Sequence, residues 1–285
     1  MWRNCHQPAR YSALAAVLLC LAPGEVQGHG EVHEIIALIT REIEAKPKMA
    51  SLRFERASLY AQNDHFAEAL EDLAQVNALE PGNDLPMALR GNIFRRMGKP
   101  AEARAEQEAF LKKHPAHAQV RFDYCQTLAE LKETEAALRE LDALITAAEH
   151  PAPDAVAMRL RLTEARGADG PAAALVWLDA FLTKHPLPVF EEEALRLEMK
   201  LNRPGGAVKR MDAMIAKAPR PESLFLRKAE LLAGAGDKAG AATAARAALD
   251  AIGRLPAHVR STRATTGLEA RAQQILSRPP LSRPP

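Results

Sequence analysis

Apolar and polar positions alternate along the chain with the period of an α-helix. In residues 31–45, for example, Ile35, Leu38, Ile39 and Ile43 lie three or four residues apart. This spacing puts them on one stripe of a helix. Similar stretches follow along the chain, and prolines or glycines, which end helices, separate them. The pattern predicts an all-α chain made of many short helices.

Prolines divide the chain into segments of nearly equal length. Successive members of one row are 33 to 37 residues apart, and each marks a boundary between helices because proline cannot continue a helix interior. A regular period indicates a repeat array, since an ordinary helical bundle imposes none. The row consists of Pro47, Pro81, Pro115, Pro151, Pro186, Pro219 and Pro256.

Small residues recur with the same period. A small side chain lets two antiparallel helices approach closely, so these positions predict where the helices of a pair meet. Cys125 belongs to one of the two series, which favours packing over nucleophilic chemistry for this thiol. The first series is Ala57, Gly91 and Cys125, and the second is Ala69, Ala103, Ala137, Ala174, Ala207 and Ala241.

Two segments resemble the tetratricopeptide repeat. The first is residues 51–81, and the second follows it directly; the tryptophan usual near the repeat start is absent, and Arg53 stands there in the first copy. The matching residues are Ala57, Tyr60, Phe66, Ala69 and Pro81 in the first, and Gly91, Phe94, Gly98, Ala103 and Pro115 in the second. The resemblance covers about residues 31–256. It implies a right-handed α-solenoid, a superhelix of antiparallel helix hairpins.

The repeat frame predicts the organisation of the chain. Terminal repeats must cap the exposed apolar ends of such an array, and the RPPLSRPP ending has no residues to form a core. We therefore expect a signal peptide over 1–28, a half-repeat helix over 29–46, about six hairpins over 47–256, a capping helix over 257–277 and a disordered tail over 278–285.

The N-terminus is typical of an export signal. Arg3 and Arg10 precede an apolar run over residues 11–22. A proline–glycine break and the small residue Gly28 then follow, in the order of a secretory signal peptide. The alternative is an uncleaved membrane anchor, although the run is short for spanning a bilayer. The sequence thus predicts an exported protein, periplasmic or secreted, that meets a membrane only if this segment is retained.

Charge and motifs narrow the function. The formal net charge is +2, which disfavours nucleic-acid binding because that binding depends on neutralising phosphates. The sequence carries no phosphate-binding glycine loop and no Gly-x-Ser-x-Gly elbow. No cofactor and no catalytic activity are therefore predicted, and a binding scaffold is favoured.

Two histidines leave a second hypothesis open. Cleavage after Gly28 would make His29 the new N-terminus, where an amine and an imidazole could chelate a copper-type metal, with His33 four residues on. The simpler alternative is an N-terminal tail with two unrelated histidines, because chain termini are usually mobile. A metal-handling role is thus the alternative to a protein-binding role.

The resemblance also implies a binding groove. In tetratricopeptide arrays the first helix of each hairpin lines a concave surface. Arginines gather there, and their planar forks suit carboxylates, so the expected partner is a protein or peptide, with an acidic one favoured. The predicted groove residues are Phe54, Asn92, Arg95, Arg96, Phe122, Arg159, Arg166, Arg196 and Lys200.

Processing gives the first testable prediction. The mature protein should begin at His29 or within a few residues of it, because the segment ending at Gly28 is the best cleavage site. N-terminal sequencing of the exported protein measures this directly. Recovery of a chain that still carries Met1 would show that the leader is retained.

Overall fold

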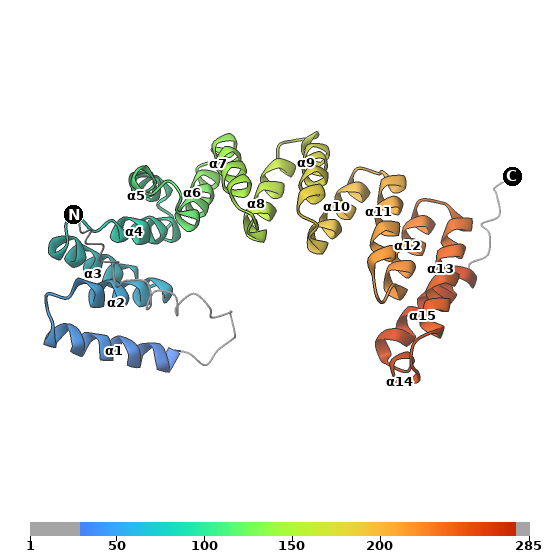
Figure 1. Cartoon of the computed structure of the whole chain (residues 1–285), viewed down its shortest axis with the longest axis horizontal. Coiled ribbons are helices and arrows are strands. Elements are labelled where there is room, and N and C mark those ends of the chain that lie inside the picture. The colour runs from blue at the N-terminus through green and yellow to red at the C-terminus, as the bar shows by residue number, and fades with distance from the viewer. Residues whose placement is uncertain (1–28, 278–285) are drawn as a thin grey trace, which may run out of the picture. The chain divides into compact units, whose positions relative to one another are not determined.

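A computed structural model describes residues 29–277. The expected signal peptide and the expected C-terminal tail lie outside these residues. Within them the regular elements are fifteen helices, which pack as sequential antiparallel pairs (Figure 1). The all-α class predicted from the sequence is confirmed. The chain divides into two compact units, Met1–Leu131 and Lys132–Pro285, which are described separately.

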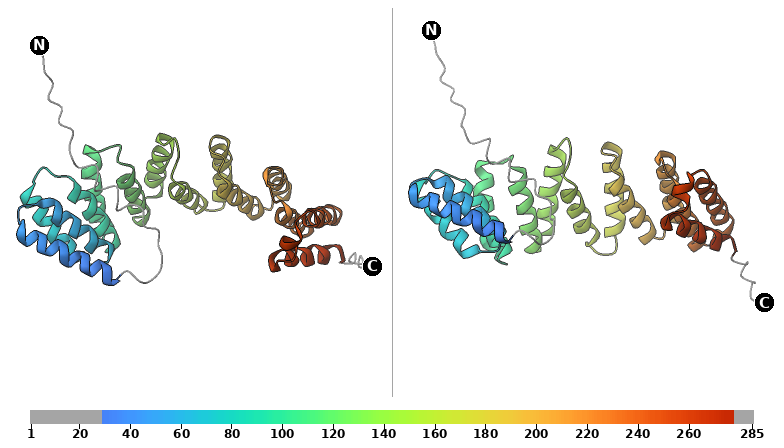
Figure 2. Two further views of the ribbon diagram at one scale, coloured as in Figure 1. Left: turned by 60° about the horizontal axis from the view of Figure 1, so that its bottom comes forward. Right: turned by 90° about the horizontal axis from the view of Figure 1, so that it is seen from below.

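The first unit contains six of the helices. They are α1 (His29–Ala45), α2 (Ala50–Gln62), α3 (Phe66–Leu79), α4 (Leu85–Arg96), α5 (Pro100–Lys113) and α6 (Ala118–Glu130). Helices α2 and α3 form one hairpin, and α4 and α5 form the next (Figure 2). Helix α1 packs on α2, α3 packs on α4, and α5 packs on α6. Each helix therefore contacts its neighbours in sequence, as in a repeat array.

The second unit contains the remaining helices. They are α7 (Thr134–Ala147), α8 (Pro153–Glu164), α9 (Gly170–Lys184), α10 (Pro188–Lys200), α11 (Pro204–Lys217), α12 (Glu222–Gly234), α13 (Lys238–Gly253), α14 (Ala257–Arg260) and α15 (Arg263–Ser277). Hairpins α8–α9, α10–α11 and α12–α13 follow one another, and α15 packs on α12 and α13. The region expected to form one capping helix, residues 257–277, contains two helices, the short α14 and the longer α15.

A left-handed backbone residue follows each first helix and turns the chain back. Five of these residues come directly after the residue that caps the helix, where a left-handed conformation ends a helix well; Gly167 stands one position later. Half of the six are not glycine, so the repeat tolerates some backbone strain here. The φ angles are 62° at Asp64, 71° at Gly98, 62° at Lys132, 95° at Gly167, 54° at Asn202 and 84° at Gly236.

The small residues lie where the helices meet, as predicted. Ala69, Ala103, Ala137 and Ala174 are all 0% exposed. At Gly91 the approach is closest: a Cβ atom there would lie 2.8 Å from Cγ of Gln107 on α5. Only a residue without a side chain lets α4 approach α5 this closely while Gln107 fills the contact.

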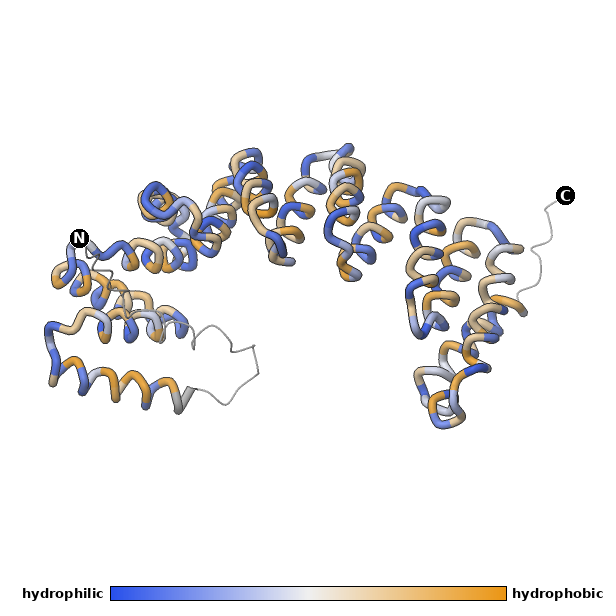
Figure 3. Tube along the Cα trace, viewed as in Figure 1, coloured by the Kyte–Doolittle hydropathy of each residue, from blue (hydrophilic) through white to orange (hydrophobic). Residues whose placement is uncertain are grey.

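Apolar and polar residues alternate at short intervals along the helices, as the hydropathy colouring of the trace shows (Figure 3). In the second unit, for example, α9 buries Leu175, Leu178 and Phe181. This amphipathic pattern is that of helices packed in a layer, with one face toward neighbouring helices and the other toward water. No helix between residues 29 and 277 is long and apolar enough to cross a bilayer.

Enlarging a small position should destabilise the protein. We expect Ala103→Leu to lower the free energy of unfolding by about 1–3 kcal/mol, because extra methylene groups overpack a filled contact. Ala105→Leu is the control, since Ala105 is exposed on the same helix. Chemical denaturation of both variants measures the difference. Equal stability of the two would contradict the buried register of Ala103.

Candidate interaction surface

In the first unit, Arg96 joins α4 to α2, which are the first helices of two successive hairpins. It extends from the end of α4 to the end of α2, where its Nη1 donates to the backbone oxygen of Ala61 at 2.5 Å and its Nη2 donates to Asp64 at 2.5 Å. Its guanidinium also lies over the ring of Phe66, 5.1 Å from the ring centre. The side chain is thus held by a backbone oxygen, an acid and an aromatic face, and it is not a free cation.

Arg95 makes the corresponding link to the next first helix. Its Nη1 donates to Oε1 of Glu130 at the end of α6, at 3.0 Å. The Arg95 side chain is 20% exposed and that of Glu130 is 41% exposed. A pair with one partly buried member is less screened by water than a fully exposed pair. Arg95 and Arg96 therefore bind two different neighbouring helices from adjacent positions on α4.

Asn92 on α4 adds an uncharged side-chain contact to α6, the helix that Arg95 also contacts. Its side-chain amide donates to Oδ2 of Asp123 at 3.4 Å, and Gln119 donates to the other oxygen at 3.1 Å. Burial of the Asp123 carboxyl nevertheless raises its pKa, because the low-dielectric surroundings disfavour the charged form. Asn92 was predicted as a ligand for a partner, but here it stabilises a buried acid of its own chain.

Phe54 and Phe122 are the apolar members of the predicted set in this unit. Phe54 is half-buried on α2 and packs against the core cluster that includes Ala57 and Leu73. Phe122 is half-buried on α6. Both rings leave part of their surface accessible, so they can offer apolar contact beside the ion pairs.

In the second unit Glu164 gathers two of the predicted cations. Arg196 on α10 donates from Nη1 and Nη2 to its two carboxylate oxygens, at 3.0 and 2.6 Å, and Lys200 donates to Oε1 at 2.7 Å. The hydrogen bonds from Arg196, and then from Lys200, lower the pKa of Glu164 to about 2. The carboxylate at the end of α8 therefore binds the first helix of the next hairpin through two cations.

Arg159 and Arg166 lie elsewhere than the sequence frame placed them. Arg159 packs between second helices: its Nε donates to Asp142 on α7 at 2.8 Å, and its guanidinium lies 4.0 Å from the ring centre of Trp177 on α9. Its side chain is 13% exposed. Arg166 lies past the end of α8 and pairs with Glu135 on α7 at 2.8 Å. The structure thus places Arg159 in a packing position between α7 and α9.

The displacement has a simple geometric cause. The α8–α9 connection runs from Ala165 to Asp169, whereas the α2–α3 connection has only the residues from Asn63 to His65. Helix α9 also begins four residues before its small residue Ala174, one more than α3 does before Ala69. The standard spacing between the two helices of a repeat, applied backwards from Ala174, therefore assigns each residue of α8 a position three residues away from its true one. Three residues are most of a helical turn, so the predicted face of α8 is rotated.

The acids of this surface were not paired with any cation in the prediction from the sequence. Each pairs with a cation about one repeat away: 32 residues separate Asp64 from Arg96, 35 separate Arg95 from Glu130, and 32 separate Glu164 from Arg196. Another such pair, Arg227 with Glu192, joins α12 to α10. Opposite charges recurring at the repeat period are the sequence signal that could have revealed these pairs.

The alternative hypothesis, metal binding by His29 and His33, concerns the start of α1. The His33 ring lies edge-on to that of His65, with 6.4 Å between ring centres. Between residues 29 and 277 there is no group of three or more His, Cys, Asp or Glu side chains placed to hold a metal ion. The side chain of His29 lies outside the described residues.

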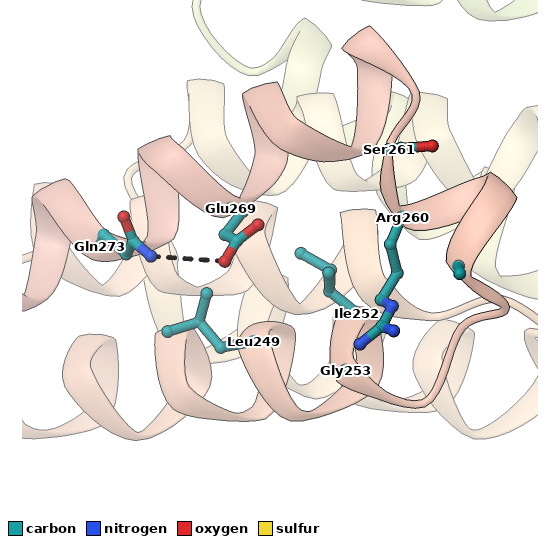
Figure 4. A pocket seen from close by; sticks show the side chains of 8 residues that line it. Leu249, Ile252, Gly253, Arg260, Ser261, Glu269 and Gln273 are labelled. Atoms are coloured by element: carbon teal, nitrogen blue, oxygen red, sulfur yellow. Dashed lines mark hydrogen bonds between the residues drawn. The ribbon is translucent and has the colours of Figure 1, made fainter.

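A shallow hollow lies at the C-terminal end of the second unit (Figure 4). Leu249 and Ile252 of α13 form its apolar side. Glu269 and Gln273 of α15 face them and are joined by a 3.4 Å hydrogen bond, and Arg260 of α14 points in from the other end. This mixed lining can accept a polar side chain, but it contains none of the residues predicted from the repeat frame.

Comparison with known proteins agrees with this geometry. Residues 89–155 match the family profile described as Tetratricopeptide repeat. None of the curated proteins compared with the chain matches it.

Solved structures share the fold at low sequence identity. A tetratricopeptide repeat protein from Parabacteroides merdae is 13% identical, with a TM-score of 0.50 over 86% of this chain and 93% of that one. The C-terminal part of a TPR repeat-containing protein from Cytophaga hutchinsonii is 14% identical, with a TM-score of 0.51 over 78% of this chain and 92% of that one. Identity this low speaks for the fold alone. Residues 89–155 thus match the tetratricopeptide repeat profile, and the chain shares the helical fold of solved tetratricopeptide repeat structures.

The cluster of Glu164, Arg196 and Lys200 should make the stability of the fold depend on pH. Because the folded pKa is lowered, the cluster stabilises the fold above the ordinary glutamate pKa, and this stability is lost as pH falls toward about 2. Glu164→Gln should cost about 1 kcal/mol at neutral pH, a modest value because water screens the half-exposed cations. The difference from the unsubstituted protein should vanish in strong acid.

Tryptophan fluorescence can follow this unfolding, since Trp177 lies in the second unit and the chain's other tryptophan is Trp2. Glu44→Gln, at an exposed position on α1, is the control. A cost for Glu164→Gln that does not change with pH would show that charge is not the cause.

Proposed function

We propose that the chain is an exported scaffold that binds a protein or peptide partner along the first helices of its hairpins. Tetratricopeptide repeat proteins generally serve as non-catalytic scaffolds for protein binding, and that general role supports the proposal. The observation that carries it is the row of cations and half-buried rings on α4 and its neighbouring first helices.

An acidic partner would bind this surface by taking the place of an acid that is already paired with an arginine. Arg95 is paired with Glu130, so an acidic partner must replace that carboxylate. The exchange is favourable only if the partner adds further contacts, such as apolar contact with Phe54 or Phe122. In this view Glu130 competes with the partner for Arg95, which makes the affinity adjustable by changing either member of the pair.

Export is the second part of the proposal. It rests on the order of charge, apolar run and small residues over residues 1–28. A scaffold in the periplasm or outside the cell would meet partners exposed there, and a pull-down from periplasmic extract is the direct way to recover one.

Two opposite substitutions test the exchange. With the partner recovered by pull-down, Arg95→Gln should weaken binding about tenfold or more, corresponding to about 1.4 kcal/mol. Glu130→Gln should strengthen binding instead, because it frees Arg95 from its intramolecular competitor. Isothermal titration calorimetry measures both affinities, and circular dichroism checks that each variant is folded.

The control is Lys112→Gln, which removes an exposed charge from the second helix α5 and should leave the affinity unchanged. If Arg95→Gln and Glu130→Gln weaken binding equally, the pair supports the fold and takes no part in recognition. If neither has an effect, the partner binds another surface.

A further inference from the structure

The segment from the end of α13 to the start of α15 carries basic residues without acids. From residue 251 to residue 268 the sequence contains no aspartate or glutamate. Arg254, His258, Arg260 and Arg263 lie within this run, and all four are exposed. None of them forms an ion pair with another residue in the described part of the chain. These four residues are called the basic cluster below.

Elsewhere in the protein, acids of other segments neutralise a similar run of cations. Residues 85–101 also contain no acid, and they carry four cations. Three of the four are paired: Arg90 with Glu106, Arg95 with Glu130 and Arg96 with Asp64. Among residues 29–277 the basic cluster has no such partners, so its positive charge is open to another molecule.

The two acids that flank the run do not neutralise it. Asp250 lies on α13, four residues before Arg254, and Glu269 lies on α15. Neither forms an ion pair with the basic cluster, and Glu269 instead accepts a hydrogen bond from Gln273 at 3.4 Å. A terminal cap needs a polar outer face for solubility, but not an excess of one charge. The stability of the fold therefore does not account for this excess.

The hollow at the end of the second unit lies beside the basic cluster. Arg260 points into it, and Leu249 and Ile252 of α13 line its apolar side (Figure 4). A guanidinium can hold a carboxylate through two parallel hydrogen bonds, and an apolar side chain next to that carboxylate can cover Leu249 and Ile252. A flat lipid surface cannot fill a hollow, so this shape favours a polypeptide over a membrane.

We propose that the basic cluster and this hollow together bind an acidic segment of another protein, one that carries an apolar side chain between its acids. The carboxylates of the segment pair with Arg254, Arg260 and Arg263, and the apolar side chain enters the hollow. At Arg95 an acid of the chain itself must first be displaced, whereas here the arginines are unpaired. Association should therefore be fast and should weaken steeply with salt.

This surface contains no residue of the first-helix surface. The proposal thus goes beyond the proposed function, and either can fail without the other. Its weak point for an acidic partner is Glu269, whose carboxylate faces Leu249 and Ile252 across the hollow. Glu269 repels incoming acids, and removing its charge should therefore raise the affinity.

Fluorescence anisotropy can measure binding to a labelled pentapeptide in which four glutamates surround a leucine, at low salt. Arg260→Gln combined with Arg263→Gln should weaken binding about tenfold, because two exposed charge pairs are lost. Glu269→Gln should strengthen binding, and a gain in affinity cannot result from a failure to fold. The same peptide with glycine in place of leucine should bind more weakly, because nothing then enters the hollow.

The matched control is Arg139→Gln combined with Lys184→Gln. It removes two exposed positive charges from the second helices α7 and α9, and it should leave the affinity unchanged. Arg95→Gln should also leave it unchanged, which separates this surface from that of the proposed function. Equal losses in the two double variants would overturn the proposal, since net charge alone would then explain the binding.

Vesicles made of equal parts phosphatidylcholine and phosphatidylglycerol test the other anionic surface. If the protein binds these vesicles through Arg260 and Arg263 but does not bind the peptide, the cluster contacts a membrane and the proposal is wrong. Absence of peptide binding at low salt would overturn it too, and so would a loss of affinity in Glu269→Gln.

Discussion

The fold depends on how closely the two helices of a hairpin can approach. At Gly91 the distance to the Gln107 side chain leaves no room even for a Cβ atom, and the alanines at the paired positions are completely buried. Because dispersion forces fall off steeply with distance, a hairpin held slightly apart would lose much of its packing. The small residues therefore fix the spacing of each pair, and the longer side chains on either side fill the space that remains.

A second constraint acts between hairpins, and it is electrostatic. The ends of first helices are linked by pairs such as Arg96–Asp64 and Arg196–Glu164, each formed by residues about one repeat apart. A single surface pair contributes little. However, every repeat can make the same kind of link, and in a repeat protein the interface terms between neighbours add up along the array. These side chains therefore belong to the stacking of repeats as well as to any binding surface.

The sequence predicted the helices and their close contacts well, because both follow from periodic patterns of small and apolar residues. It predicted the surface less well. The cations were identified from their repeat positions, but their acidic partners were not sought, although Glu130 and Glu164 lie about one repeat from Arg95 and Arg196. Arg159 lies between α7 and α9, at a different register from Phe54 on α2, because the α8–α9 connection is longer than in the other hairpins. A change in connection length rotates a helix face, and composition gives no sign of it.

The paired state of the surface bears on selectivity. A free arginine cluster would attract any acidic chain, and its binding would weaken steeply with salt. A closed pair such as Arg95–Glu130 attracts a lone carboxylate far less, since the incoming acid must displace one that is already in place. Binding is then favourable only for a partner that also contacts the apolar surface nearby, for example that of Phe122. Specificity would thus come from combining charge exchange with apolar contact, because neither alone offsets the cost of opening the pair.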